Sequence, residues 1–114
     1  MTTESAPLPP SPVATVIEAV QTRRCVNAIY NRDKVVLAPH VLYMRHGEPF
    51  VDAVTVARNG MLPREIKVGT FKLSGLGDLV LTGRSFEVHR AFDGAADKYA
   101  GAALITVERE AALA

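Results

Sequence analysis

The chain has 114 residues, which fits a single domain, and its 48 % hydrophobic and 22 % charged residues are typical of a globular protein with a buried core. A net charge of +1 argues against a strongly basic nucleic-acid binder, and no apolar run reaches the roughly 18–20 residues that cross a bilayer. No signal-peptide pattern opens the chain and Cys25 is its one cysteine, so we expect a cytoplasmic protein with no membrane association and no internal disulfide.

Residues 1–12, MTTESAPLPPSP, hold four of the seven prolines and few side chains that could pack in a core. Segments of this kind stay extended because they cannot bury enough apolar surface to offset the loss of chain entropy on folding. We therefore predict a disordered, proline-rich arm over residues 1–12. A proline-rich ligand for a partner domain is the alternative.

A helix is predicted directly after the arm, over residues 12–23. Ser11 is a good N-cap, and Pro12 suits the first helical position, where its missing N–H leaves no hydrogen bond unmade. The apolar residues that follow recur with the period of one helix face, at Val13, Val16, Ile17 and Val20. The pattern predicts one short amphipathic helix.

The pattern then changes to the period of two that is typical of strands. Turn residues such as Asn59-Gly60 separate the apolar runs, and five strands are predicted, over residues 25–30, 34–45, 49–58, 64–73 and 78–82. Residues 103–110 favour a last strand, with a helix as the alternative. We expect a mainly β fold, a small five-stranded barrel preceded by one short α-helix, because closing a sheet removes its unpaired edges. This single domain covers residues 13–110 and ends in a C-terminal extension.

The predicted fourth strand contains a conflict of phase. Ile66 and Val68 share one face of a regular strand, whereas Phe71 and Leu73 share the other. One inserted residue would bring all four side chains to the same core, and Gly69 stands at the break, where a β-bulge tolerates glycine best. We therefore predict a bulge at Gly69.

Pro39 and His40 interrupt the second predicted strand, in LAPHVLYMR. Pro39 has no N–H to donate to a neighbouring strand, so it predicts a strand edge or a bend. At such a corner we expect His40 to be structural, with a buried neutral ring and one nitrogen donating to a backbone carbonyl or a side chain. A ligand contact and a catalytic role are the alternatives.

No constellation of catalytic or metal-binding residues is visible. The cysteine and the three histidines lack the short paired spacings of zinc sites. Ser74 lies in KLSGLG rather than in a nucleophile elbow, and the glycines there are too few for a phosphate-binding loop. We expect no enzymatic activity, no catalytic residue, no metal and no cofactor.

Positive charge gathers in the middle of the chain. Residues 23–72 hold nine basic and four acidic residues, a local net charge of +5 that would attract an anionic ligand. If the second, third and fourth strands are neighbours, their basic side chains could converge into one site; the alternative is that these charges only solvate the strand faces. The candidate ligand-binding residues are Tyr43, Arg45, Arg64, Lys67, Lys72 and His40.

The order of several short motifs resembles the WYL-domain family, over roughly residues 14–100. The motifs are VIEAVQTRRCVNAIY, VVLAPHVLYMR with its Pro-His pair, EPFVDAV and FKLSGLGDLVLTGRSFE, and FDGAADKY is similar to the stand-alone bacterial members. The resemblance implies an Sm-like five-stranded barrel after a helix. It also implies a regulatory module that senses a small anionic or nucleotide-like ligand or a protein partner.

Two departures from the family pattern concern the ligand. Pro49-Phe50-Val51 stands where the Trp-Tyr-Leu that names the family is expected, and Gly69, Ser74 and Gly75 stand where arginine, aspartate and arginine are expected. The chain also lacks the helix-turn-helix to which such modules are often fused, so we do not expect it to bind DNA by itself. We expect a non-enzymatic ligand-binding module; the alternative is an Sm-like structural protein that binds nucleic acid or forms homo-oligomers.

Overall fold

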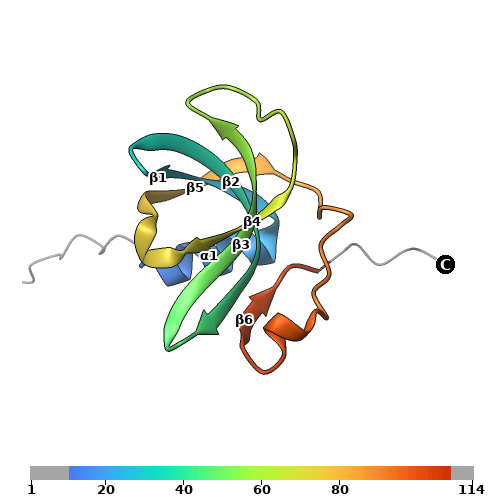
Figure 1. Cartoon of the computed structure of the whole chain (residues 1–114). Coiled ribbons are helices and arrows are strands. Elements are labelled where there is room, and N and C mark those ends of the chain that lie inside the picture. The colour runs from blue at the N-terminus through green and yellow to red at the C-terminus, as the bar shows by residue number, and fades with distance from the viewer. Residues whose placement is uncertain (1–10, 109–114) are drawn as a thin grey trace, which may run out of the picture.

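A computed structural model describes residues 11–108. It contains one α-helix and one antiparallel sheet (Figure 1), so the fold is mainly β, as expected. Residues 1–10 of the predicted arm lie outside the described residues, as do residues 109–110 of the last predicted strand. Ser11 and Pro12, the last two residues assigned to the arm, belong to the start of the helix instead.

Helix α1 (Pro12–Thr22) begins where its capping residues predicted. The Ser11 side chain accepts a hydrogen bond from the Ala14 N–H (3.1 Å), and the proline occupies the first helical position. The helix ends at Arg23, whose left-handed conformation (φ 52°) directs its N–H to carbonyls of the last turn. The helix is therefore one residue shorter than predicted.

The sheet contains six antiparallel strands. They are β1 (Arg24–Tyr30), β2 (Asp33–Arg45), β3 (Glu48–Arg58), β4 (Val68–Lys72), β5 (Gly77–Ser85) and β6 (Ala103–Thr106), with the 3₁₀ helices η1 (Leu73–Gly75) after β4 and η2 (Asp97–Tyr99) before β6. Five strands follow in the order β4-β3-β2-β1-β5, and β6 pairs with β2. The prediction of a strand over residues 103–110 is confirmed for 103–106, while the described residues 107 and 108 lie beyond the end of β6.

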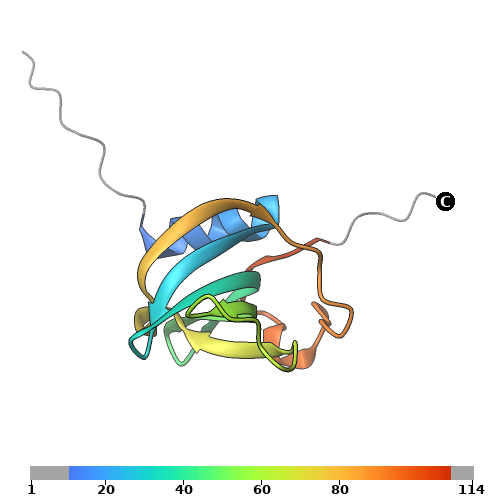
Figure 2. The same cartoon turned by 90° about the horizontal axis from the view of Figure 1, so that it is seen from above.

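The prediction of a closed five-stranded barrel is wrong. β4 and β5 are the two ends of the strand order that the described residues form, so the sheet is curled but open (Figures 1 and 2). β4 has only five residues, and η1 carries the chain from it directly into β5. β2 extends beyond its pairing with β1, and the sixth strand, β6, pairs with this second half of β2 at Val41–Tyr43.

β2 bends at His40, as the Pro39-His40 pair predicted. Pro39 lies opposite Ala53 of β3, and Val41 lies opposite Asp52, so His40 is an extra residue in β2. A β-bulge of this kind bends the strand and increases its twist. The bend divides β2 into a half that pairs with β1 and a half that pairs with β6.

The predicted bulge at Gly69 is wrong. β4 begins only at Val68, and its pairing with β3 runs without a register shift to the end of the strand. Ile66 lies in the preceding loop with 61 % of its surface exposed. Since Ile66 does not belong to the strand, no conflict of phase arises.

Replacing Gly69 with alanine is therefore expected to leave the free energy of unfolding within about 0.5 kcal/mol of wild type, or to raise it slightly. An added Cβ would lie 3.6 Å from the Phe71 ring, an ordinary van der Waals contact. Alanine also restricts the unfolded chain more than glycine does. Urea denaturation measures the change; a loss above about 1 kcal/mol would indicate a strained backbone at this position.

The core lies between α1 and the inner face of the curled sheet (Figure 2). Val16 and Val20 of the helix pack there with Leu37 of β2 and Val51 of β3, and each is 1 % exposed. The segment between β5 and β6 adds aromatic side chains to the same core. Helix, sheet and this segment together form one buried cluster.

Candidate functional site

The basic residues predicted to converge lie at two ends of the sheet. β2, β3 and β4 are neighbours, as the predicted site required. Arg45 and Lys72 lie beside the β2–β3 turn: the Lys72 ammonium is 3.0 Å from Glu48, and the Arg45 guanidinium is 5.7 Å from the centre of the Phe50 ring. Both cations therefore already have partners on β3.

Arg64 and Lys67 lie in the β3–β4 loop, which enters the other end of β4. Lys72 follows Lys67 by five positions along an extended chain, a span of about 16 Å. Both loop residues are exposed. The structure thus forms two basic groups and does not bring the four cations into one site.

Tyr43 lies in the core, where its hydroxyl belongs to a buried polar group that we call the Asp52 cluster. Asp52 is 2 % exposed, and Tyr43 is 1 % exposed. One oxygen of the carboxylate accepts bonds from the hydroxyls of Tyr43 and Thr70 (2.8 Å each). The other accepts bonds from the Lys98 ammonium (2.9 Å) and the Tyr99 hydroxyl (2.5 Å). The cluster therefore connects η2 to β3 through hydrogen bonds and an ion pair.

The hydrogen bonds determine the protonation states of the Asp52 cluster. Burial raises the pKa of the Asp52 carboxyl, but the four donated bonds, led by that of Tyr99, more than offset it, so the pKa lies below its ordinary value. Burial lowers the pKa of Lys98, and the carboxylate opposite raises it to above the ordinary value. Burial and then Asp52 raise the pKa of Tyr43 and of Tyr99. The cluster is an ion pair flanked by two neutral phenols.

Asp52 is not among the candidate residues predicted above, although the sequence carries a signal for it. In PFVDAV it is the one charged residue of an otherwise apolar run, at a position where strand alternation and burial demand a partner. Its partners Lys98 and Tyr99 come from η2, 46 and 47 residues further along the chain. No spacing rule could have paired them.

His40 is fully buried at the β2 bulge. Its Nδ1 lies 2.8 Å from the Ala38 carbonyl oxygen, and its Nε2 accepts a hydrogen bond from the His89 N–H (2.9 Å). Because a backbone N–H can only donate, the ring proton belongs on Nδ1, where it donates to the carbonyl. The ring contacts Phe86 and Phe92, with 5.1 Å between ring centres in both pairs. The predicted burial of His40 and its hydrogen bond to a backbone carbonyl are confirmed, and its structural role stays a prediction.

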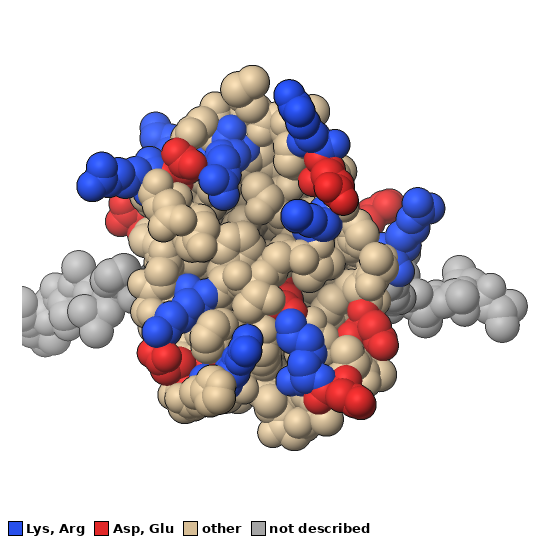
Figure 3. Space-filling model, viewed as in Figure 1, with Lys and Arg blue, Asp and Glu red and all other residues tan. Residues whose placement is uncertain are grey.

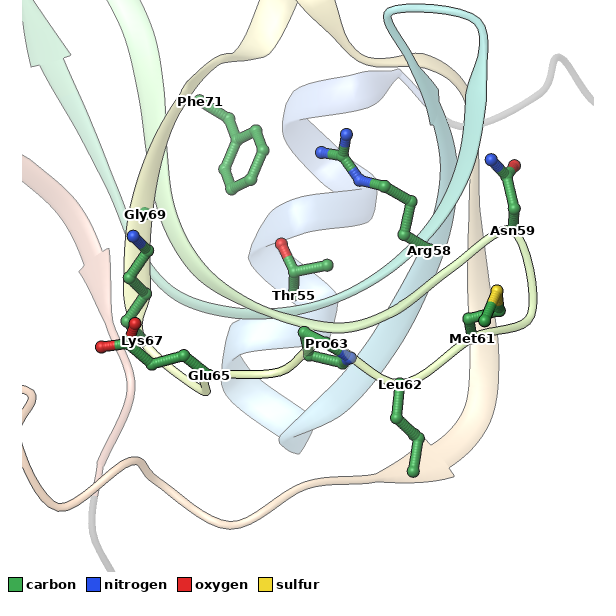
Figure 4. A pocket seen from close by; sticks show the side chains of 10 residues that line it. All are labelled: Thr55, Arg58, Asn59, Met61, Leu62, Pro63, Glu65, Lys67, Gly69 and Phe71. Carbon is green, nitrogen blue, oxygen red and sulfur yellow. The ribbon is translucent and has the colours of Figure 1, made fainter.

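An open cavity of about 580 Å³ lies at the mouth of the curled sheet (Figure 4), and we call it the loop cavity. Of the six predicted ligand-binding residues, Lys67 lines it. Its lining comes from β3, from the β3–β4 loop and from β4: Thr55, Arg58, Asn59, Met61, Leu62, Pro63, Glu65, Lys67, Gly69 and Phe71. The sequence offered a signal for this site, since MLP directly after the Asn-Gly turn is unusually apolar for a loop.

The loop cavity is hollow because small residues face the core side of the sheet at its open end. Ala53 of β3 lies opposite Gly69, and Val51 lies opposite Phe71. Thr55 follows Ala53 on the same face by strand alternation. With no side chain at Gly69, space remains beside the Phe71 ring, which forms an apolar wall continuous with the core.

The charged residues around the loop cavity are mainly basic. Arg58 reaches over the cavity toward the β4 side (Figure 4), is 48 % exposed and pairs with Asp33 at 3.1 Å. Lys67 and Glu65 stand on the loop just before β4. An anionic group could approach the two cations while an apolar group lies against Phe71. This combination fits an amphiphilic anion better than a purely polar ion.

Within residues 11–108, no three His, Cys, Asp or Glu side chains stand together in a group that could hold a metal ion. No helix in this part of the chain is both long and apolar enough to cross a bilayer. Comparisons of the chain with protein-family models, with curated proteins and with solved structures gave no match.

Proposed function

We propose that the chain is a non-enzymatic regulatory module that binds an anionic ligand with an apolar part in the loop cavity. The observation that carries this proposal is an open cavity of about 580 Å³ with Arg58 and Lys67 beside an apolar wall that includes Phe71. Ligand sites are usually concave and mostly apolar, with a few polar groups that set the orientation of the ligand. The anionic group would lie near the two cations and the apolar part against the ring.

We also propose that the chain is a WYL-type module, as its motif order suggests. Two observations support this. One helix precedes five strands in the order β4-β3-β2-β1-β5. The Pro39-His40 pair marks the bend of β2. On this proposal the fold is an open relative of the Sm-like barrel, with β6 as an addition.

The binding proposal is tested by titrating the protein with inorganic phosphate, sulfate and nucleoside monophosphates while recording amide NMR shifts. We expect millimolar or tighter binding, with shifts centred on residues 58–71. Lys67→Ala should weaken binding about three- to tenfold, the scale of one partly exposed charged contact. Lys72→Ala is the matched control, because it removes a cation from the far end of β4. Equal losses in both variants, or shifts centred elsewhere, would contradict the proposal.

The second candidate function is nucleic-acid binding on the face that carries Phe50. Arg45 and Lys72 flank this half-buried ring, and single strands are held by aromatic side chains among cations. Figure 3 shows acidic and basic side chains interspersed on the viewed face rather than one basic patch, which is why this candidate stands second. Its affinity for an oligonucleotide should fall steeply as salt rises, because bound counterions are released.

A further inference from the structure

The β3–β4 loop exposes three large apolar side chains, which we call the apolar tip. Met61, Leu62 and Ile66 are 73 %, 79 % and 61 % exposed. In Figure 4 the Leu62 side chain points away from the other labelled residues. Single exposed apolar residues are common, but three within six positions of one loop point to an interaction surface.

The charges beside the apolar tip indicate the sign of its partner. Arg64 and Lys67 belong to the same loop, and Glu65 is its single acid. Arg58 stands at the start of the loop, where it pairs with Asp33. Two copies of the chain that met tip to tip would bring these cations together, and like charges across an interface disfavour association. The surface is therefore complementary to an acidic partner rather than to itself.

The neighbouring strand and cavity indicate the shape of the partner. β4 is an end strand of the sheet that the described residues form, so it can accept a further extended chain along its outer edge. Its residues Gly69 and Phe71 line the loop cavity, which lies against the tip residues Met61 and Leu62. A chain that pairs along β4 would have alternate side chains directed toward this cavity. A flat lipid surface would use the convex tip but neither the strand edge nor the cavity.

We propose that the apolar tip, the loop cavity and the outer edge of β4 bind an extended acidic segment of a protein partner, with one bulky apolar side chain of that segment entering the loop cavity. This inference rests on the proposed function, since it names the partner of the same cavity. Main-chain pairing along β4 would supply affinity, and the cavity and the cations would supply selectivity.

The probes are capped synthetic peptides of about nine residues, the length of a short added strand. One carries Asp and Glu around a central Phe or Leu; a second has Lys in place of every acid; a third has Ala in place of the apolar residue. The first peptide should shift the amide signals of residues 61–72 and bind at least about tenfold more tightly than the other two, as expected when one anchor dominates. Preference for the basic peptide, or equal binding of all three, overturns the proposal.

Two variants test the residues. Leu62→Ser should weaken binding of the acidic peptide at least about fivefold. Lys67→Glu should abolish the preference for the acidic over the basic peptide, because it leaves as many acids as cations beside the tip. Val80→Ser is the matched control, because Val80 is 57 % exposed on β5, at the other end of the sheet, and should leave peptide binding unchanged. Loss of binding in the control variant as well overturns the assignment of the surface.

The other occupants have their own signatures. A membrane is the first of these occupants. If the protein binds no peptide but sediments with vesicles of phosphatidylserine and phosphatidylcholine, and Leu62→Ser abolishes this sedimentation, the tip binds a membrane and the proposal is overturned. Self-association that Leu62→Ser abolishes assigns it to a second copy and also overturns it. Phosphate shifts that Lys67→Ala weakens, without peptide binding, leave the proposed function standing and reject this inference alone. An absence of both phosphate and peptide binding rejects both.

Discussion

Replacing Asp52 with asparagine is expected to lower the free energy of unfolding by about 2–4 kcal/mol at pH 7. The buried carboxylate accepts four hydrogen bonds, and those from Lys98 and Tyr99 join η2 to β3. An asparagine side chain keeps one acceptor oxygen but loses the charge that pairs with Lys98. Its NH₂ group is a donor, which the surrounding hydroxyls accept only after they reorient. The contact between η2 and the sheet would weaken, which urea denaturation measures.

The size of this loss should depend on pH. The pKa of Asp52 is lowered in the folded protein. Its contribution to the free energy of unfolding is therefore fully present above the unfolded-state pKa of about 3.9 and is lost as the pH falls through the folded-state pKa. The pKa of Lys98 is raised in the folded protein. Its contribution to the free energy of unfolding is therefore fully present below the unfolded-state pKa of about 10.4 and is lost as the pH rises through the folded-state pKa. The difference in free energy of unfolding between wild type and Asp52→Asn should therefore be constant from about pH 5 to 10. It should become smaller outside that range.

Asp78→Asn is the matched control for this experiment. Asp78 is exposed on β5 with a φ of 50°, a conformation that asparagine tolerates as well as aspartate. Its free energy of unfolding should stay within about 0.5 kcal/mol of wild type. If Asp52→Asn behaved like this control, the Asp52 cluster would make no net contribution to stability.

Replacing His40 with alanine is expected to lower the free energy of unfolding by about 2–4 kcal/mol. The substitution leaves a cavity at a fully buried position and takes the acceptor from the His89 N–H. The rings of Phe86 and Phe92 lose the face and edge contacts of the imidazole. Residues 86–92 should be the first to lose protection in hydrogen exchange, because His40 connects them to β2.

His46→Asn is the control for the histidine experiment. His46 is exposed in the β2–β3 turn with a φ of 53°, which asparagine adopts readily. Its stability should change by less than about 0.5 kcal/mol. A His40→Ala protein that keeps wild-type stability but no longer binds a ligand of the loop cavity would restore the ligand-contact alternative.

Local signals in the sequence were sufficient for the elements that they specify directly. Ser11 and Pro12 located the start of α1, because a cap depends on residues only three positions apart. Alternation located β1, β2 and β3 to within one residue at each end. Pro39 located the bend of β2, because the missing N–H is a property of that residue alone.

The fourth strand and the candidate site were only partly predictable. The pattern of residues 64–73 extended β4 too far, since exposure of Ile66 depends on where the strand begins to pair with β3. Lys67, one of the candidate ligand-binding residues, lines the loop cavity, but the structure does not bring it together with Lys72. Which end of a short strand a residue occupies determines its neighbours, and that is a matter of register.

The sequence by itself thus determined the helix, the first three strands, the β2 bend and the mainly β class, because caps, alternation and proline act over a few residues. The tertiary structure alone decided that the sheet stays open, that β6 pairs with β2, and that Asp52 accepts hydrogen bonds from Lys98 and Tyr99. It also decided where the loop cavity lies. These features join segments far apart in the chain, and the contacts that select them are stabilised only once the rest of the core has packed.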